Sequence, residues 1–303
     1  MRRILPCGSQ RCQHGRYPAL RPYPLPVPPS RTPPPIVLVF AGSDPTGGAG
    51  LQADLLTLAA MGCHPLSVVT ALTAQDTRGV AAVQPVESRW VLEQARTVLA
   101  DMPVNAFKVG MVGTAENAAA VAEVIGERPE VPLVLDPVLA SGRGDPLATA
   151  ELVRVLARHL VSRATVVTPN SLEARQLAAR TGESVAVLPL ALCAERLAAL
   201  GARFVLVTGT HEPTSEVVNT LYDARGIVRT DRWERLPGSY HGSGCTLAAA
   251  VAAGLAHGRA VPDAVRDAQA YTWQALRRAF RPGAGQAIPD RSVREPDVAP
   301  TPE

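Results

Sequence analysis

The stretch Tyr240–Thr246, YHGSGCT, places two glycines and a cysteine directly before an Ala-rich segment with helical character. A helix that begins near Gly244 leaves its first amide N–H groups without intrahelical partners, and the aligned peptide dipoles add partial positive charge there. Glycines at these positions allow successive N–H groups to face one anion without interference from side chains. The amides of Gly242, Ser243 and Gly244 therefore predict a site for a phosphoryl group.

The same helix end gives Cys245 a possible chemical role. Partial positive charge favours thiolate over thiol, so we expect a lowered pKa and a group able to take a proton from an attacking hydroxyl. The alternative is an ordinary loop in which Ser243 caps the helix and Cys245 is a small buried hydrophobe. The chain contains no GxxxxGK[ST], GxSxG or HExxH motif, so this turn is the best candidate for an anion site.

A second glycine-rich turn, Gly47–Gly50, follows an apolar run and opens a helix in AGSDPTGGAGLQADL. Asp54 lies four residues beyond Gly50, where the helix dipole stabilises a carboxylate that could also accept a hydrogen bond from a ligand. A tight turn with an acidic residue at the start of a helix explains the same letters without a ligand. Gln75, after the next apolar run, carries both donors and acceptors suited to the edge of an aminopyrimidine, although a solvated loop glutamine is equally consistent.

Two carboxylates and an amide follow later apolar runs. Asp136 ends one run, and Glu173 lies three residues after Asn170. Such groups at adjacent strand ends could hold Mg²⁺ through waters, as that ion prefers when it bridges phosphates. A helix cap by Asn170 with Glu173 as its capping-box partner explains this pair without a metal, and the two roles are compatible. Lys108 is the only lysine of the chain, and no role follows from its position.

The elements that must position these residues alternate along the chain between short apolar runs and amphipathic segments, which is typical of a parallel sheet. We predict a doubly wound α/β fold with a mostly parallel sheet, helices on both faces and an antiparallel edge. Strands are expected at 36–42, 65–73, 106–111, 132–138, 165–170 and 203–210, with helices at 49–62, 88–101, 114–127, 147–160, 171–180 and 189–201. A hairpin of 216–224 and 226–236 and helices at 244–257 and 262–280 follow.

The polar residues above then gather where such sheets bind ligands, outside the carboxyl ends of the strands. The Pro-rich segment 1–35 is expected to be a disordered extension, residues 36–281 a single domain, and residues 282–303 a flexible tail.

Composition excludes several classes of function. The net charge of +3 is spread along the 303 residues without a basic and aromatic cluster, so nucleic-acid binding has little support. No segment is long and apolar enough to span a bilayer, and an odd count of five cysteines without paired metal-ligand spacing fits a reducing cytoplasm.

Taken together, AGSDPTGGAGLQADL, TALTAQDTRGV, KVGMVG, LDPV, TPNSLEA and HGSGCTL resemble the hydroxymethylpyrimidine/phosphomethylpyrimidine kinase family of thiamin biosynthesis, a branch of the ribokinase-like fold. The resemblance covers about residues 36–281. It implies two successive phosphorylations of 4-amino-5-hydroxymethyl-2-methylpyrimidine by ATP with Mg²⁺, in a cytoplasmic enzyme that is commonly a homodimer.

The resemblance also assigns residues. Cys245 matches the catalytic base, and the amides of Gly242, Ser243 and Gly244 match the anion hole. Gln75 matches the residue at the pyrimidine edge, with Asp54, Ala49 and Met111 lining the pyrimidine pocket. The magnesium and phosphate region matches Asp136, Asn170 and Glu173.

Thr208-Gly209-Thr210-His211 stands where the family usually reads Lys-Gly-Gly-His, so a cation expected to contact the nucleotide phosphate is absent beside Thr208 and Gly209. The segment RPGAGQAIPDR also departs from the usual ending. Three alternatives remain open: a pyridoxal or pyridoxine kinase, a pyrimidine-binding protein without turnover, and an acyl transferase in which His241 activates Cys245.

Overall fold

The computed structural model describes residues 33–140, 144 and 147–292. Within these residues nine strands form one sheet in the order β3-β2-β1-β4-β5-β6-β7-β8-β9. The pairs from β2 to β7 are parallel, whereas β3 at one edge and β8 and β9 at the other are antiparallel. The strands are β1 (Ile36–Ser43), β2 (His64–Asp76), β3 (Gly79–Pro85), β4 (Ala106–Val109), β5 (Leu133–Leu135), β6 (Val166–Val167), β7 (Phe204–Val207), β8 (Glu216–Asp223) and β9 (Gly226–Glu234).

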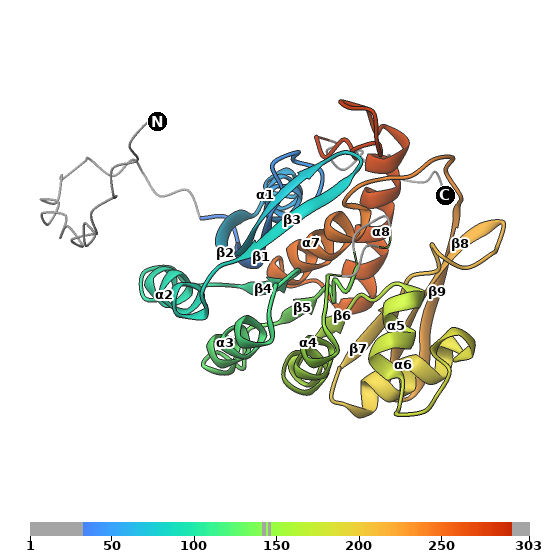
Figure 1. Ribbon diagram of the computed structural model, residues 1–303, viewed down its shortest axis with the longest axis horizontal. Helices are drawn as coiled ribbons and strands as arrows, with labels where there is room; N and C mark the ends of the chain where they lie inside the picture. The colour runs from blue at the N-terminus through green and yellow to red at the C-terminus, as the bar shows by residue number, and fades with distance from the viewer. Residues whose placement is uncertain (1–32, 141–143, 145–146, 293–303) are drawn as a thin grey trace, which may run out of the picture. The chain divides into compact units, whose positions relative to one another are not determined.

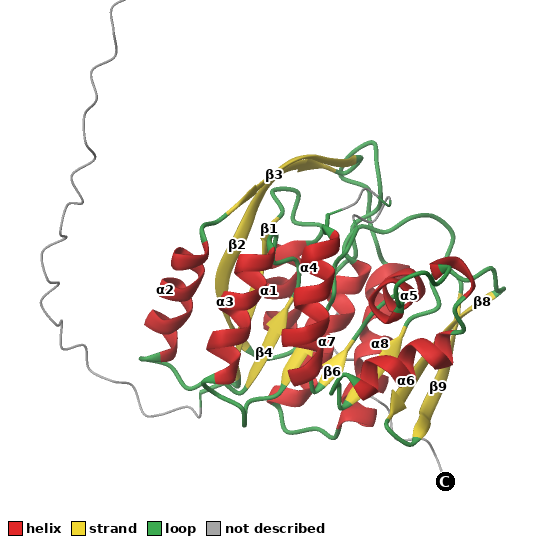
Figure 2. Ribbon diagram, turned by 60° about the horizontal axis from the view of Figure 1, so that its bottom comes forward, coloured by secondary structure: helices red, strands yellow, loops and turns green. Residues whose placement is uncertain are grey.

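Helices cover both faces of this sheet (Figure 1). One face carries α2 (Ser88–Leu99), α3 (Ala115–Gly126), α4 (Ala150–Val155), α5 (Ser171–Ala178) and α6 (Leu190–Ala199). The other carries α1 (Gly50–Ala60), α7 (Ser243–Ala256) and α8 (Val261–Arg277). Figure 2 shows the first group in front of the strands, with α7 and α8 behind them. The predicted α/β fold with an antiparallel edge is therefore confirmed.

The alternation of side chains along β1 explains how one strand serves both layers. Leu38 and Phe40 pack into the core under α2 to α6, whereas Val37, Val39 and Ala41 face α1, α7 and α8. All five side chains are buried. Such an unbroken apolar run is typical of a parallel strand that is covered on both faces.

Helix α7 is the central helix of its layer, and its sequence accounts for this position. Residues 246–255 are all buried, and half of them are alanine. A helix that is apolar on every side belongs in the interior, and small side chains allow it to lie close to the sheet. The helix contacts α1, α8, β1, β4 and β5, so its first turn is fixed against the middle of the sheet.

Two predicted boundaries were wrong. Strand β2 continues to Asp76 and forms a hairpin with β3, which the sequence analysis did not predict, so Gln75 lies within a strand and not in a loop. The flexible tail predicted from residue 282 instead begins with a packed segment: Ala287, Ile288 and Arg291 are buried. Among the described residues, no helix combines the length and the apolar character needed to cross a membrane.

Candidate active site

The first turn of α7 leaves a group of backbone donors open. Gly242 precedes the helix with φ at 81°, and Ser243 is its first residue, so the alternative in which the Ser243 side chain caps the helix is wrong. The first amide that bonds back into the turn is that of Thr246, which donates to the Gly242 carbonyl. In the part of the chain that the structure describes, the amides of Gly242, Ser243 and Gly244 donate to no protein acceptor. Dipole and donors together make this turn suited to an anion.

Cys245 follows these amides, but its thiol differs from the expectation. Burial raises the pKa of Cys245 to about 12, and the nearby carboxylates of Asp136 and Asp54 act in the same direction, whereas the Lys108 ammonium opposes them. The expected lowered pKa is therefore wrong for the protein without ligands. The group is a thiol near neutral pH, because desolvation of the thiolate outweighs the positive charges around it.

Lys108 lies at the centre of this buried charge cluster. Its side chain has no exposed surface, and its Nζ donates to Asp54 Oδ2 at 2.8 Å and lies 3.9 Å from Asp136 Oδ2. Burial alone would lower the pKa of Lys108, but the surrounding anions raise it overall, so the ammonium stays charged. Burial raises the pKa of Asp54 to about 6 despite the attraction of Lys108. Asp54 is fully buried in α1, so its side chain lies behind the glycine-rich turn and offers no exposed surface to a ligand.

Asp136 and Glu173 come together behind the ends of β5 and β6. Glu173 and Asn170 form the predicted capping box: the Asn170 side chain accepts from the amides of Leu172 and Glu173, and Glu173 accepts from the Asn170 amide. Burial, and then repulsion from Asp136, raises the pKa of Glu173 to about 8. The capping role is thus confirmed, and the carboxylate also faces a second acid.

These two acids fit a hydrated Mg²⁺. Asp136 Oδ2 is buried and has no hydrogen-bond partner among the described residues, so one carboxylate oxygen is left for a cation. No group of three or more His, Cys, Asp or Glu side chains in the described residues is arranged to hold a metal. Mg²⁺ needs no such cage, because it commonly keeps several waters and takes its other ligands from phosphates.

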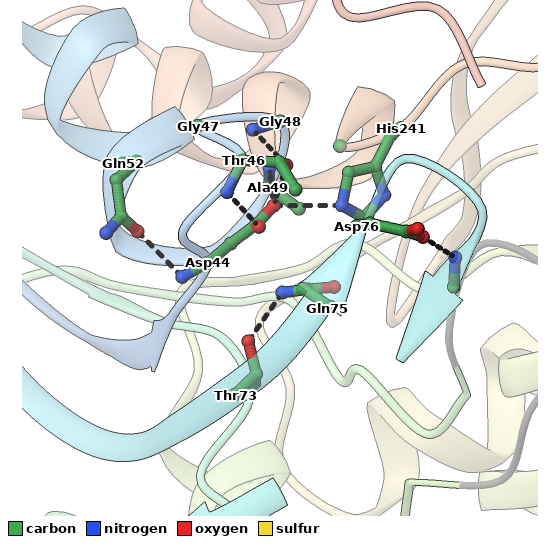
Figure 3. Close-up of polar contacts among 12 residues, drawn as sticks. Asp44, Thr46, Gly47, Gly48, Ala49, Gln52, Thr73, Gln75, Asp76 and His241 are labelled. Carbon is green, nitrogen blue, oxygen red and sulfur yellow. Dashed lines mark hydrogen bonds and ion pairs between the residues drawn. The ribbon is translucent and has the colours of Figure 1, made fainter. Parts of the chain in front are cut away.

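The turn from Asp44 to Ala49 is organised around one carboxylate (Figure 3). Asp44 accepts from the amides of Thr46 and Ala49 and from the Thr46 hydroxyl. His241, from the segment before α7, contacts Asp44 Oδ2 through Nε2 at 2.8 Å. Burial alone would raise the pKa of Asp44, but the bonds from His241, Thr46 and Ala49 lower it overall. The histidine thus serves the turn, which leaves the acyl transferase alternative without its base.

Three residues expected at the pyrimidine, Gln75, Met111 and Ala49, lie at or after the carboxyl ends of β2, β4 and β1. Gln75 in β2 donates through Nε2 to the Thr73 hydroxyl at 2.8 Å, and its side chain is partly exposed beside the Asp44 turn (Figure 3). Met111 is also partly exposed, and its carbonyl accepts from the Thr70 hydroxyl. Ala49 ends the turn as the residue before α1. These three residues come from three different elements.

Thr208 and Gly209 lie next to Asn170 at the end of β7. Thr208 and Asn170 form a parallel bridge, and the Ser171 amide donates to the Thr208 carbonyl. The Gly209 amide donates to the Asn219 side chain, and a Cβ at Gly209 would collide with the Val218 carbonyl. The three predicted nucleotide residues are therefore adjacent, although the Gly209 amide is already used by the protein.

Sequence reasoning missed Asp44 and Arg291, considered His241 only as the base of an acyl transferase, and noted Lys108 without a role. Arg291 is buried and contacts the Gly47–Gly50 turn from the C-terminal segment. For Lys108 the sequence held a clue. It stands between Phe107 and Val109 in an apolar run that is expected to be a buried strand, and a buried charge needs a partner of opposite charge. Arg291 carried no such clue, because its partners are two backbone carbonyls about 240 positions away and the Thr246 hydroxyl, which no local pattern connects to it.

Comparison with known proteins gives concordant results. The family model for phosphomethylpyrimidine kinase matches residues 44–290. A hydroxymethylpyrimidine/phosphomethylpyrimidine kinase of Rhizobium meliloti is 42% identical over 256 residues, which cover 83% of this chain and 94% of that protein.

Two solved kinase structures are similar in fold to this chain. The pyridoxal kinase of Staphylococcus aureus in complex with ADP is 30% identical with a TM-score of 0.77, covering 85% of this chain and 93% of that one. The phosphomethylpyrimidine kinase of Clostridium difficile is 33% identical with a TM-score of 0.68, covering 80% of this chain and 99% of that one.

Proposed function

The chain belongs to the phosphomethylpyrimidine kinase family, and we propose that it transfers the γ-phosphoryl group of ATP to 4-amino-5-hydroxymethyl-2-methylpyrimidine and then to the resulting monophosphate. The reaction would supply the pyrimidine diphosphate for thiamin biosynthesis. The observation that carries this proposal is the set of open amides of Gly242, Ser243 and Gly244 beside Cys245. In phosphoryl transfer, positioning and charge stabilisation account for most of the lowering of the barrier, and fixed backbone donors supply both.

The pyrimidine lies between the Asp44 turn and the end of β2. Gln75 presents an amide that can both donate to and accept from the ring edge, while Ala49 and Met111 contact its apolar surface. Asp54 supports this pocket from behind through Lys108 and does not touch the substrate. The hydroxymethyl group would then point toward the first turn of α7, where Cys245 in its minor thiolate form would receive the hydroxyl proton and become the thiol.

The nucleotide approaches the same turn from the β6 and β7 side. Asn170, Thr208 and Gly209, which lie side by side, would contact its phosphates, and Asp136 and Glu173 would hold Mg²⁺ through water. The ion supplies charge neutralisation on the phosphate oxygens when it is bound. A Glu173 carboxyl whose pKa is raised to about 8 gains from a nearby cation, because the cation stabilises its ionised form.

A coupled assay that detects ADP tests the proposal. We expect a higher kcat/KM for the pyrimidine alcohol than for pyridoxal, and measurable turnover of the monophosphate. Pyridoxal kinase is the second candidate, because a solved pyridoxal kinase shares this fold at 30% identity. A preference for pyridoxal would replace the first assignment with the second.

The absence of a lysine at Thr208 bears on the second phosphorylation. If the missing cation matters, the monophosphate will be turned over more slowly than the alcohol, or with a higher KM for ATP. Pyrimidine binding in calorimetry without any ADP formation would indicate a binding protein without turnover. The cytoplasmic location and the homodimer stay predictions, and light scattering after size-exclusion chromatography would test the latter.

A further inference from the structure

The C-terminal segment Gly283–Arg291 contacts three parts of the candidate site that come from distant stretches of the chain. The Gly285 and Gln286 amides donate to Thr77, at the tip of the hairpin that carries Gln75. Ala287 exchanges backbone hydrogen bonds with Ser239 and His241, just before α7. At its end, Arg291 reaches the Gly47–Gly50 turn.

Arg291 is a buried cation that donates its hydrogen bonds to neutral oxygens, although the buried carboxylates of Asp54 and Asp44 attract its charge from farther away. Arg291 is only 5% exposed. Among the described residues, no carboxylate forms an ion pair with it. Its partners are neutral oxygens: Nη1 donates to the Gly47 carbonyl at 3.2 Å, Nη2 to the Gly48 carbonyl, and Nε to the Thr246 hydroxyl at 3.0 Å. Burying a guanidinium against neutral groups is costly, so a role beyond packing is expected.

The three acceptors lie on the two sides of one junction. The Gly48 carbonyl packs against Gly242, where an added Cβ would collide with it, so the glycine-rich turn and the residue before α7 touch backbone to backbone. The Thr246 hydroxyl, which accepts from Arg291, donates in turn to the Gly242 carbonyl at 2.8 Å. The planar guanidinium of Arg291 therefore donates hydrogen bonds both to the glycine-rich turn and to the first turn of α7, in a fixed geometry.

We propose that Arg291 is a positioning residue for phosphoryl transfer: it clamps the Gly47–Gly48 turn to the first turn of α7 and so sets the distance between the bound pyrimidine and the open amides. The clamp rests on the proposed function for its substrate. Near-attack geometry is sensitive to displacements of about 1 Å, so loosening this junction lowers kcat even though Arg291 touches neither substrate. Its positive charge also adds to the potential around Cys245.

The test compares Arg291→Met, which removes both fork and charge, with Arg291→Lys, which keeps the charge but cannot hold three acceptors in one plane. The matched control is Arg278→Met, which breaks an exposed ion pair to Asp290, next to Arg291. We expect kcat to fall at least about tenfold in both Arg291 variants, with melting still cooperative, and to stay within about twofold of wild type in the control.

A second readout does not depend on turnover. Alkylation of Cys245 by iodoacetamide, followed by mass spectrometry across alkaline pH, reports its thiolate fraction. The charges that face this sulfur are Lys108 from β4, Asp54 from α1, Asp136 after β5 and Arg291. We expect Arg291→Met to move the alkylation profile to higher pH and Arg291→Lys to restore it without restoring kcat.

Full kcat in a folded Arg291→Met or Arg291→Lys variant would overturn the clamp, as would an equal loss in Arg278→Met. If the wild-type protein does not phosphorylate the pyrimidine, the proposed function fails. In that case an unchanged alkylation profile in Arg291→Met would still count against the role of Arg291.

Discussion

At the scale of single residues, the protonation state of Cys245 decides how the proton of the attacking hydroxyl leaves in the reaction we propose. Burial raises the pKa of this thiol to about 12, so the reactive anion is a minor species near neutral pH and grows as pH rises. The open amides of Ser243 and Gly244 are present at every pH, because backbone donors do not titrate. The proposed site thus combines backbone donors that are constant with pH and a strong base, the thiolate, that is a minor species near neutral pH.

We therefore predict a kcat that increases with pH from about 7 to about 10, because each unit below the thiol pKa reduces the thiolate about tenfold. Cys245→Ala should lower kcat by about 10²-fold, leave KM for the pyrimidine nearly unchanged and remove the alkaline rise. Steady-state kinetics over this pH range measure both effects. A flat wild-type profile would exclude the thiolate from proton transfer.

Lys108 and Asp54 form the ion pair beneath the site, and both side chains are fully buried. Lys108→Met should reduce the free energy of unfolding by about 3–5 kcal/mol, because it leaves a buried carboxylate without its cation. The double variant Lys108→Met with Asp54→Asn should recover most of that loss. Urea denaturation at neutral pH measures the cycle, and a cost below about 1 kcal/mol for the single variant would contradict this account of the pair.

The sequence predicted residues at this scale when a local motif implied them. Gly242, Ser243 and Gly244 follow from the start of a helix, and the Asn170–Glu173 cap follows from its spacing. It did not predict the raised pKa of Cys245, because desolvation depends on which elements enclose the sulfur. The pairing of Lys108 with Asp54 required knowledge that β4 and α1 face each other.

At the scale of elements, the start of α7 is held against the glycine-rich turn by close backbone contact. Gly242 has a positive φ of 81° and no room for a Cβ, because the Gly48 carbonyl lies there. Gly258, just after the other end of α7, has a similar φ of 77° but nothing within 4 Å of an added Cβ. The two glycines separate the effect of backbone strain from the effect of the contact.

Gly242→Ala should therefore abolish most activity, lowering kcat/KM by about 10²-fold or more as the turn and the amides separate. Gly258→Ala should cost about 1–2 kcal/mol of stability from left-handed strain alone and leave kcat/KM unchanged. Kinetics and thermal melting of both variants provide the comparison. Equal losses of activity in the two would mean that strain, and not the contact, limits the site.

Most elements were predictable, because apolar runs and helical periodicity are local. The hairpin partner β3 was not, because GVAAVQP follows a short turn and carries few large apolar side chains. Since β3 pairs with the end of β2, it changes Gln75 from a loop residue to one held in a strand. The polar residues at the strand ends indicated at which edge of the sheet they would gather. They did not indicate the backbone conformation at each strand end, such as the pairing of Gln75 with β3.

At the scale of the whole molecule, the folded unit extends from Pro34 through the segment Gly283–Arg291, which contacts the candidate site. For residues 283–291 the prediction of a flexible tail was wrong, because backbone amides donate to Thr77 and Ser239 and the Arg291 side chain donates to the Gly47–Gly50 turn, whereas residues 293–303 of the predicted tail lie outside the described residues. Such contacts leave no trace in hydrophobic periodicity. The family match, which reaches residue 290, is consistent with a domain longer than 36–281.

Two deletions test these boundaries. Removal of residues 1–33 should leave kcat/KM and the melting temperature close to those of the full chain. Removal of residues 282–303 should lower kcat/KM at least about tenfold, because the segment holds the hairpin and the turn together. A shortened C-terminus with full activity would show that residues 283–291 are dispensable for the site.

The most direct test of the whole account is a crystal structure with Mg²⁺, the pyrimidine alcohol and a non-hydrolysable ATP analogue. We predict γ-phosphoryl oxygens within about 3.2 Å of at least two of the amide nitrogens of Gly242, Ser243 and Gly244, with the substrate hydroxyl beside Cys245. A γ-phosphoryl group bound away from this turn, or amides turned to protein acceptors in the complex, would contradict it.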